Sequence, residues 1–180
     1  MEEIVVEALD VHTLDPKSAD AQRLTDLVHE MSDWYRGLNE SGIQYYLDHS
    51  EGGRVFVIRE GGIIMAAACY EVKHERGAGN PVVMSAVSYP VAFVHGIVTA
   101  HEAQGKGYGS HVFSQVIENA REAGIPYAQL TCNPEREVAI LLYYRLGFME
   151  IGNKQKVTDV TKVTTLFELD LAKEGLATVG

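Results

Sequence analysis

Residues 96–110 read GIVTAHEAQGKGYGS and carry glycine at positions 105, 107 and 109. β-Branched residues precede these glycines, and the apolar residues after them recur with the period of an amphipathic helix. This order predicts a strand, a glycine-rich turn and the start of a helix. The first N–H groups of a helix lack partners within it and carry partial positive charge, and glycine lets an anion approach them. The stretch therefore predicts a phosphate-binding loop.

Other phosphate and metal motifs do not fit this stretch. A P-loop requires Ser or Thr after its lysine, but Lys106 is followed by glycine. A dinucleotide-binding loop would require Gly or Ala where Ser110 stands. No further motif of a protein kinase is present, and His101-Glu102 lacks the second histidine of a zinc protease. The pattern that remains is Gln-x-x-Gly-x-Gly at residues 104–109.

The overall composition is that of a globular protein. The chain has 180 residues, of which 46% are apolar and 22% charged, and we expect one domain over residues 1–171 with a loose tail at 172–180. The net charge of −10 argues against nucleic-acid binding. This acidity either keeps the protein in solution or attracts a cationic substrate.

Cysteine usage and the chain start add further expectations. Cys69 and Cys132 lie in apolar runs outside any CxxC motif, so we expect reduced core residues. No basic signal segment and no membrane-spanning apolar run is visible, so a cytoplasmic location without a membrane partner is expected. No His, Cys and carboxylate residues show ligand spacing, so no metal is expected.

The apolar pattern predicts a mixed α/β chain whose helices pack on one sheet. Asp15-Pro16 is expected to open the first helix, and Gly61-Gly62 to close a hairpin. The remaining helices are expected at 41–47 and 109–123 and over the stripe of Val138, Leu141, Leu142 and Leu146. Strands are expected at 4–9, 54–58, 63–72, 82–87, 91–99, 127–132, 148–151 and 164–169.

The motif at residues 104–109 resembles the pyrophosphate-binding motif of the GCN5-related N-acetyltransferase (GNAT) family. A second stretch, residues 139–148, reads AILLYYRLGF. The last helix of that family typically carries A-x-x-L-Y, then three residues, then Gly-Phe, and the chain matches it in register at Ala139, Leu142, Tyr143, Gly147 and Phe148. The resemblance runs from about residue 4 to 169 and is strongest over 93–148.

The resemblance implies a fold and an activity. The fold is α/β (α+β), with a mixed, mostly antiparallel sheet of six or seven strands flanked by four helices. The activity is transfer of an acetyl group from acetyl-CoA, the cosubstrate, to a primary amine of a small molecule or peptide by direct attack in a ternary complex. A non-catalytic acyl-CoA sensor or scaffold, and an acyltransferase for longer acyl groups, are the alternatives. The family often forms dimers, so a homodimer is expected by analogy.

The resemblance also implies which residues bind the coenzyme. The pantetheine and the acyl carbonyl would contact the backbone of Ile97, Val98 and Thr99. The pyrophosphate would be bound by the loop of Gln104, Gly105, Lys106, Gly107, Tyr108, Gly109 and Ser110, with Lys106 adding a positive charge. Family members often have Asn where Arg136 stands, and we expect Asn133 to take over its contact with the pantetheine.

Two residues are expected to transfer protons. Tyr143 would act as general acid for the leaving thiolate, unless it is a buried aromatic residue, a role that suits Tyr144 better. His95 would act as base, because some family members carry histidine at the matching strand position and alternation places it on the same face as Ile97. The alternatives for His95 are a core histidine or the rival base Glu102, for which a loop-bracing role is also expected. His101 and His111 are expected at the surface.

The acceptor site is expected on the first two helices, by analogy with the family. Aromatic and acidic residues there suit an ammonium or aryl amine, whereas Arg36 suits a carboxylate-bearing acceptor. The same residues could instead form helix core and a solvated face. They are Trp34, Tyr35, Tyr45, Tyr46, Glu40, Asp48 and Glu51.

Overall fold

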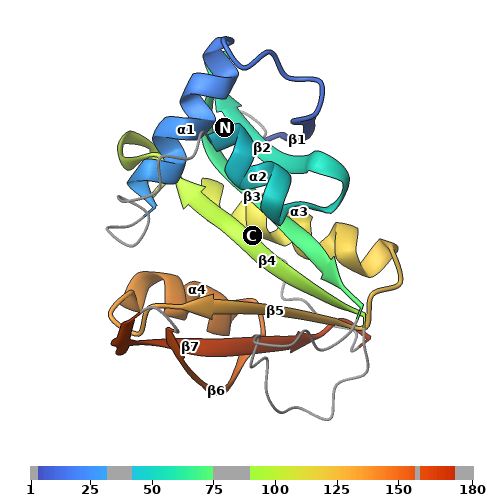
Figure 1. The fold of residues 1–180 in the computed structure, drawn as a ribbon, viewed down its shortest axis with the longest axis vertical. Helices are drawn as coiled ribbons and strands as arrows, with labels where there is room; N and C mark the ends of the chain where they lie inside the picture. Colours follow the sequence, from blue (N-terminus) through green and yellow to red (C-terminus); the bar gives the residue numbers. More distant parts are fainter. Residues whose placement is uncertain (1–3, 32–41, 75–89, 157–158, 173–180) are drawn as a thin grey trace. The chain divides into compact units, whose positions relative to one another are not determined.

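The computed structural model describes residues 4–31, 42–74, 90–156 and 159–172. Seven strands form one sheet in the order β1-β2-β3-β4-β5-β7-β6 (Figure 1). The strands are β1 (Val6–Asp10), β2 (Arg54–Glu60), β3 (Ile63–Lys73), β4 (Val91–Thr99), β5 (Tyr127–Cys132), β6 (Met149–Lys156) and β7 (Asp159–Asp170). The helices are α1 (Ala19–Glu30), α2 (Gly42–His49), α3 (Tyr108–Glu122) and α4 (Glu137–Arg145). The predicted fold class, a mostly antiparallel sheet with four helices, is confirmed.

The chain divides into two compact units, which we call unit 1 (residues 1–71 and 94–116) and unit 2 (residues 72–93 and 117–180). In unit 1, β1 pairs antiparallel with β2, and β2 with β3. Gly61 and Gly62, with φ of 58° and 84°, close the predicted β2–β3 hairpin. Two successive positive φ values belong to the turn type that matches the twist of a hairpin.

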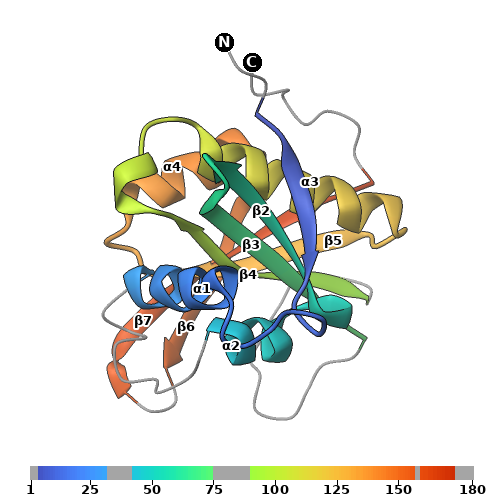
Figure 2. The same cartoon turned by 90° about the horizontal axis from the view of Figure 1, so that it is seen from above.

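The core of unit 1 lies between two helices and the strands. Helices α1 and α2 lie side by side in both views (Figures 1 and 2). Buried side chains of both helices, such as Leu24, Leu27 and Tyr45, pack with Val55 and Val57 of β2. Each fully buried leucine or valine side chain contributes about 1.5–3 kcal/mol by leaving water, so this cluster holds the helices on the strands.

The start of α1 differs from the prediction. The helix begins at Ala19, and the Ser18 hydroxyl caps it by accepting a hydrogen bond from the Ala21 N–H at 3.2 Å. Asp15 instead accepts a hydrogen bond from the Lys17 N–H at 2.9 Å in the turn before the helix. The prediction of Asp15 as cap was wrong because Ser18, three residues later, supplies the capping oxygen.

In unit 2, the first residues of β4 pair in parallel with β5, and β7 pairs antiparallel with both β5 and β6. The predicted apolar face of α4 is corrected. Val138 and Leu141 are 85% and 57% exposed, whereas Tyr143 and Leu146 are buried. Apolar residues fill every position from 138 to 144, so the helical period alone could not select the buried face.

Several predictions concern residues that the structure does not describe. The strand expected at 82–87 lies outside the described residues, as do Trp34, Tyr35, Arg36 and Glu40. The two cysteines are free and buried, as predicted. Among the described helices, none combines the length and apolar character needed to cross a bilayer. The single domain over 1–171 remains a prediction.

Candidate active site

The glycine-rich loop has the predicted local structure. Strand β4 ends at Thr99, a short 3₁₀ turn follows at His101–Ala103, and α3 begins at Tyr108. Gly105 and Gly107 have φ of 81° and 83°, a conformation that residues with a Cβ rarely adopt. Residues 104–107 are exposed and residues 108–110 half-buried. The loop thus presents backbone groups at the start of a 15-residue helix.

Gly109 is glycine for a different reason. It lies inside the helix, where its backbone is regular, but an added Cβ would stand 2.8 Å from the Thr99 hydroxyl oxygen. The first turn of α3 therefore approaches the end of β4 more closely than any side chain would allow. This close approach requires glycine at the last position of the Gln-x-x-Gly-x-Gly motif.

Ion pairs within unit 1 brace the loop. The Arg23 guanidinium donates to Glu102 at 2.5 Å and to the Ile64 carbonyl at 2.9 Å. The backbone N–H of Glu102 makes the largest contribution to lowering the pKa of the Glu102 carboxylate, and the hydrogen bond from Arg23 lowers it further. Glu102 therefore has the bracing position that was one of its two predicted roles.

Lys106 has a carboxylate partner. Its ammonium donates to both oxygens of Glu60, at 2.9 and 2.7 Å, and the Tyr108 hydroxyl lies 3.3 Å from the same carboxylate. The hydrogen bond from Lys106 lowers the pKa of Glu60, and the one to Glu60 raises the pKa of Lys106. Both side chains are almost half exposed, so water screens the pair and it can exchange partners readily.

The strand before the loop departs from regular geometry. Gly96 has φ of 61°, and an added Cβ would lie 2.6 Å from the Tyr46 ring, whose hydroxyl donates to the Gly96 carbonyl at 3.3 Å. Val98 is buried, and Ile97 and Thr99 are half-buried. The residues expected to bind pantetheine therefore follow directly after the irregular position in β4.

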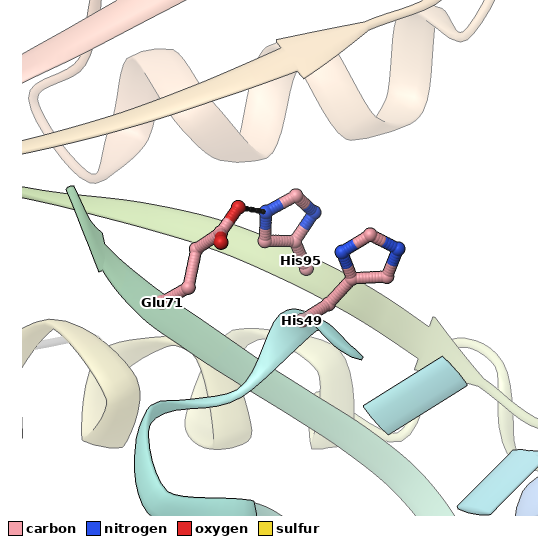
Figure 3. Close-up of side chains that lie close together, drawn as sticks. All are labelled: His49, Glu71 and His95. Carbon is pink, nitrogen blue, oxygen red and sulfur yellow. Dashed lines mark hydrogen bonds and ion pairs between the residues drawn. The ribbon is translucent and has the colours of Figure 1, made fainter. Parts of the chain in front are cut away.

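His95 belongs to a polar cluster of three side chains (Figure 3). Its Nε2 lies 2.7 Å from Glu71 Oε1. The His49 ring stacks on the His95 ring with centroids 4.6 Å apart and planes 22° apart. The side chains of His95 and Glu71 are 17% and 26% exposed. His95 is thus neither a fully buried core residue nor a surface residue.

Sequence reasoning missed Glu71 and His49. The one available signal was an acidic residue near the end of the apolar run at 63–72. The three side chains come from α2, β3 and β4 and lie at least 22 residues apart in the chain. No spacing rule could have grouped them, because only the tertiary structure brings these elements together.

These three residues are also of types that can bind a metal ion. One donor atom from each lies within 4.8 Å of the others, in a grouping that the sequence did not predict. Zinc requires lone pairs that converge on one tetrahedral centre. The two histidine rings lie in nearly parallel planes, 22° apart, with centroids 4.6 Å apart, so lone pairs lying in those planes do not converge on one centre. The geometry therefore favours a hydrogen-bonded histidine–glutamate pair, and the absence of a metal stays a prediction.

Tyr143 belongs to unit 2 and has a very different environment. Its side chain is buried, as in the alternative interpretation of Tyr143 as a buried aromatic residue, with the rings of Phe148 and Phe167 at 6.3 and 5.5 Å between centroids. Burial raises the pKa of Tyr143 far above its ordinary value, and the adjacent Cys132 thiol, to which it is hydrogen-bonded, adds to this. Tyr144 was the expected buried residue, but it is 48% exposed, so that expectation was wrong.

Asn133 and Arg136 shape the turn that leads into α4. Asn133 Oδ1 accepts a hydrogen bond from the Glu135 N–H, and the Asn133 carbonyl accepts one from the Arg136 N–H, both at 3.0 Å. Asn133 is half-buried and Arg136 exposed. The structure shows this local role for Asn133, and contact of either residue with the pantetheine remains a prediction.

The remaining expected residues divide between core and surface. Tyr45 and Tyr46 are fully buried core residues, as in the alternative interpretation of the acceptor region. Asp48 and Glu51 are both exposed. His101 is exposed as predicted. His111 is partly exposed, and its Nδ1 lies 2.9 Å from the Gly107 carbonyl of the loop.

Comparison with known proteins agrees with this fold. The model of the acetyltransferase (GNAT) family matches residues 22–148. No curated protein sequence matches the chain. Among solved structures, an apo agmatine N-acetyltransferase mutant has a TM-score of 0.70 at 18% identity, with 93% of this chain and 100% of that one covered.

Two bacterial structures are similar over nearly the whole chain. The ribosomal-protein-S18-alanine N-acetyltransferase of Escherichia coli has a TM-score of 0.66 at 15% identity, covering 99% of this chain and 100% of that one. The yncA protein of Salmonella typhimurium, a putative acetyltransferase solved with its cofactor acetyl-CoA, has a TM-score of 0.68 at 16% identity with the same coverage. At these identities the likeness concerns the fold.

Proposed function

Because the chain belongs to the acetyltransferase (GNAT) family, we propose that it is an N-acetyltransferase that acetylates a primary amine of a small molecule or peptide. Acetyl-CoA is the cosubstrate, and its thioester supplies the activated acetyl group. The observation that carries the proposal is the exposed loop at residues 104–107, where two glycines have left-handed φ, followed by a first turn of α3 that approaches Thr99 closely at Gly109.

The loop is proposed to bind the pyrophosphate of the coenzyme. A Cβ at Gly105 would meet no atom within 4 Å, so the space beside the loop is open, and only the backbone conformation demands glycine there. The N-terminus of α3 offers N–H donors and partial positive charge to an anion. Lys106 adds a positive charge, and its hydrogen bond to Glu60 keeps its ammonium beside the loop. Ile97, Val98 and Thr99, with Asn133 and Arg136, are proposed to contact the pantetheine arm.

The two proton-transferring residues have the required chemistry. An amine is mostly an ammonium ion near neutral pH and must lose a proton before its lone pair can attack the thioester carbonyl. His95 is proposed to take that proton. The new C–N bond forms as the C–S bond breaks, and Tyr143 is proposed to donate its hydroxyl proton to the leaving sulfur. Its raised pKa keeps the hydroxyl protonated at neutral pH.

The acceptor is proposed to be cationic. The net charge of −10 attracts cations, and Glu71 adds a carboxylate beside the proposed base. The structural relatives include an agmatine N-acetyltransferase and a protein-alanine N-acetyltransferase. A small polyamine-like amine and a peptide with a free N-terminus are therefore the first acceptors to try. The cytoplasmic location and the homodimer remain predictions.

Calorimetry with acetyl-CoA tests the loop. We expect binding by the wild type and clearly weaker binding by Gly109→Ala, because the new Cβ meets the Thr99 hydroxyl. The double variant with Thr99→Ala removes that hydroxyl and should recover part of the affinity. Absence of binding by the wild type would overturn the proposal.

Release of free thiol from acetyl-CoA across an amine panel tests the transfer. Turnover with any amine supports the N-acetyltransferase. Binding without turnover on the whole panel would favour the non-catalytic sensor or scaffold. Faster turnover with longer acyl-CoA species would identify an acyltransferase for longer acyl groups.

A further inference from the structure

His95 contacts the carboxylate of Glu71 on the neighbouring strand (Figure 3). We propose that Glu71 is a positioning residue for His95, which it holds in the tautomer that accepts the acceptor's proton at Nδ1. This inference rests on the proposed function, because it assigns a second residue to the same step. Glu71 lies in β3 and carries no part of the sequence motifs that identify the family.

The hydrogen bond selects the tautomer. An ionised carboxylate can only accept hydrogen bonds, so His95 Nε2, 2.7 Å from Glu71 Oε1, must carry the proton. In the neutral imidazole the basic lone pair is then on Nδ1. Without the Glu71 carboxylate this hydrogen bond no longer keeps the proton on Nε2, and any enzyme with the proton on Nδ1 would present a protonated nitrogen to an ammonium ion.

The Glu71 carboxylate makes His95 a stronger proton acceptor. Glu71 stabilises the imidazolium, and partial burial of the pair limits screening by water. The His49 ring stacks on the His95 ring, with centroids 4.6 Å apart. Among the described residues, the titratable groups near the cluster include Tyr45, against His49, and Cys69 and Tyr46. Burial raises the pKa of Cys69 and Tyr46, so both stay neutral.

The proton transfer is balanced within the pair. The ammonium proton moves to Nδ1 of His95 and the imidazole becomes an imidazolium, while the nitrogen lone pair of the acceptor becomes available to attack. Glu71 keeps its charge and exchanges no proton, as the buried carboxylate does in a serine-protease triad. Within the pair, only the His95 ring changes its charge during the transfer.

The test compares wild type, Glu71→Gln, Glu71→Asp and a control, Glu122→Gln. Glu122 is an exposed residue at the end of α3 that is not a member of the cluster, so its variant removes one negative charge without changing the cluster's side chains. Nitrogen NMR of histidine-labelled protein reports the tautomer and titration midpoint of His95 without requiring turnover. We expect the Nε2–H tautomer in the wild type. In Glu71→Gln we expect a mixture of tautomers and a midpoint lower by about one pH unit or more.

Activity provides the second readout. In Glu71→Gln we expect kcat/KM to fall by at least about tenfold at neutral pH. The acidic limb of its pH profile should move to lower pH by the same amount as the NMR midpoint. Glu71→Asp should restore the tautomer and part of the rate, because it retains a carboxylate. Glu122→Gln should match the wild type in both measurements.

The outcomes separate this inference from the proposed function. An unchanged tautomer and midpoint in Glu71→Gln would overturn the positioning role, even in an active acetyltransferase. The predicted NMR changes in a protein that acetylates no amine would support the pair and overturn the function. If micromolar zinc broadens all three side-chain signals and Glu71→Gln abolishes that effect, the cluster is a metal site and the positioning role fails.

Discussion

His95 and Tyr143, the two side chains proposed to transfer protons, lie in contrasting surroundings. His95 lies in a partly exposed cluster with a carboxylate at 2.7 Å and a second imidazole stacked on it. Tyr143 is buried against two phenylalanine rings and a thiol. A residue that must gain a positive charge needs polar, hydrated partners, whereas one that must stay neutral until the last step is suited to an apolar pocket.

The largest expected effect comes from removing the hydroxyl of Tyr143. Tyr143→Phe should lower kcat by about 100- to 10,000-fold, the usual contribution of a general acid, with little change in acetyl-CoA affinity by calorimetry. The loss should be the same from pH 6 to 9, because the raised pKa keeps the wild-type phenol protonated there. Tyr144→Phe, at the exposed neighbouring position, serves as the control. An unchanged kcat in Tyr143→Phe would show that Tyr143 is not the general acid.

The same substitution should alter stability at alkaline pH. The phenol titrates at about pH 10 in an unfolded chain, and its pKa is higher in the folded protein. Its contribution to stability is therefore complete below pH 10 and is lost as the pH rises through the folded value. Thermal unfolding above pH 10 should be less steeply pH-dependent in Tyr143→Phe than in the wild type.

Removing the base should have a somewhat smaller, pH-dependent effect. His95→Gln should lower kcat/KM by about 100-fold at neutral pH, and the loss should shrink as rising pH deprotonates the amine in solution. His29→Gln, on the exposed face of α1, is the control. A loss in His95→Gln that does not vary with pH would show that His95 acts in some other way.

Next in size is the effect of the thiol beside Tyr143. Cys132→Ala should lower kcat less than Tyr143→Phe and cost about 1 kcal/mol of unfolding free energy, the net value of one hydrogen bond. Cys132→Ser, which keeps a polar partner of similar size, should retain more activity. Equal activity in both variants would show that the phenol needs no partner at this position.

The smallest effect concerns the stacked imidazole. His49→Phe retains a ring against His95 and removes a group that can become positive. The titration midpoint of His95 should rise by about half a pH unit to one unit, the size expected for a positive charge 4–5 Å away at the dielectric constant of water. Histidine NMR measures it directly. A fall in the midpoint would mean that His49 supports rather than opposes the imidazolium.

Much of the fold was predictable because it depends on neighbours along the chain. The glycines at 61, 62, 105 and 107 have the positive φ values that their turns require, and β5 spans the predicted residues 127–132. The prediction failed where local patterns were ambiguous. Residues 138–144 of α4 are all apolar, so the helical period of apolar residues did not show that Tyr143 is buried and Tyr144 exposed.

The sequence by itself determined the order of elements, the loop of residues 104–110 and its likeness to a known family, because backbone conformation and helix starts follow from consecutive residues. The tertiary structure alone decided that Glu71 and His49 contact His95, and that Cys132 contacts Tyr143. Strand pairing and helix packing set which distant residues meet, so the environment that tunes each proton-transferring group appears only in the folded chain.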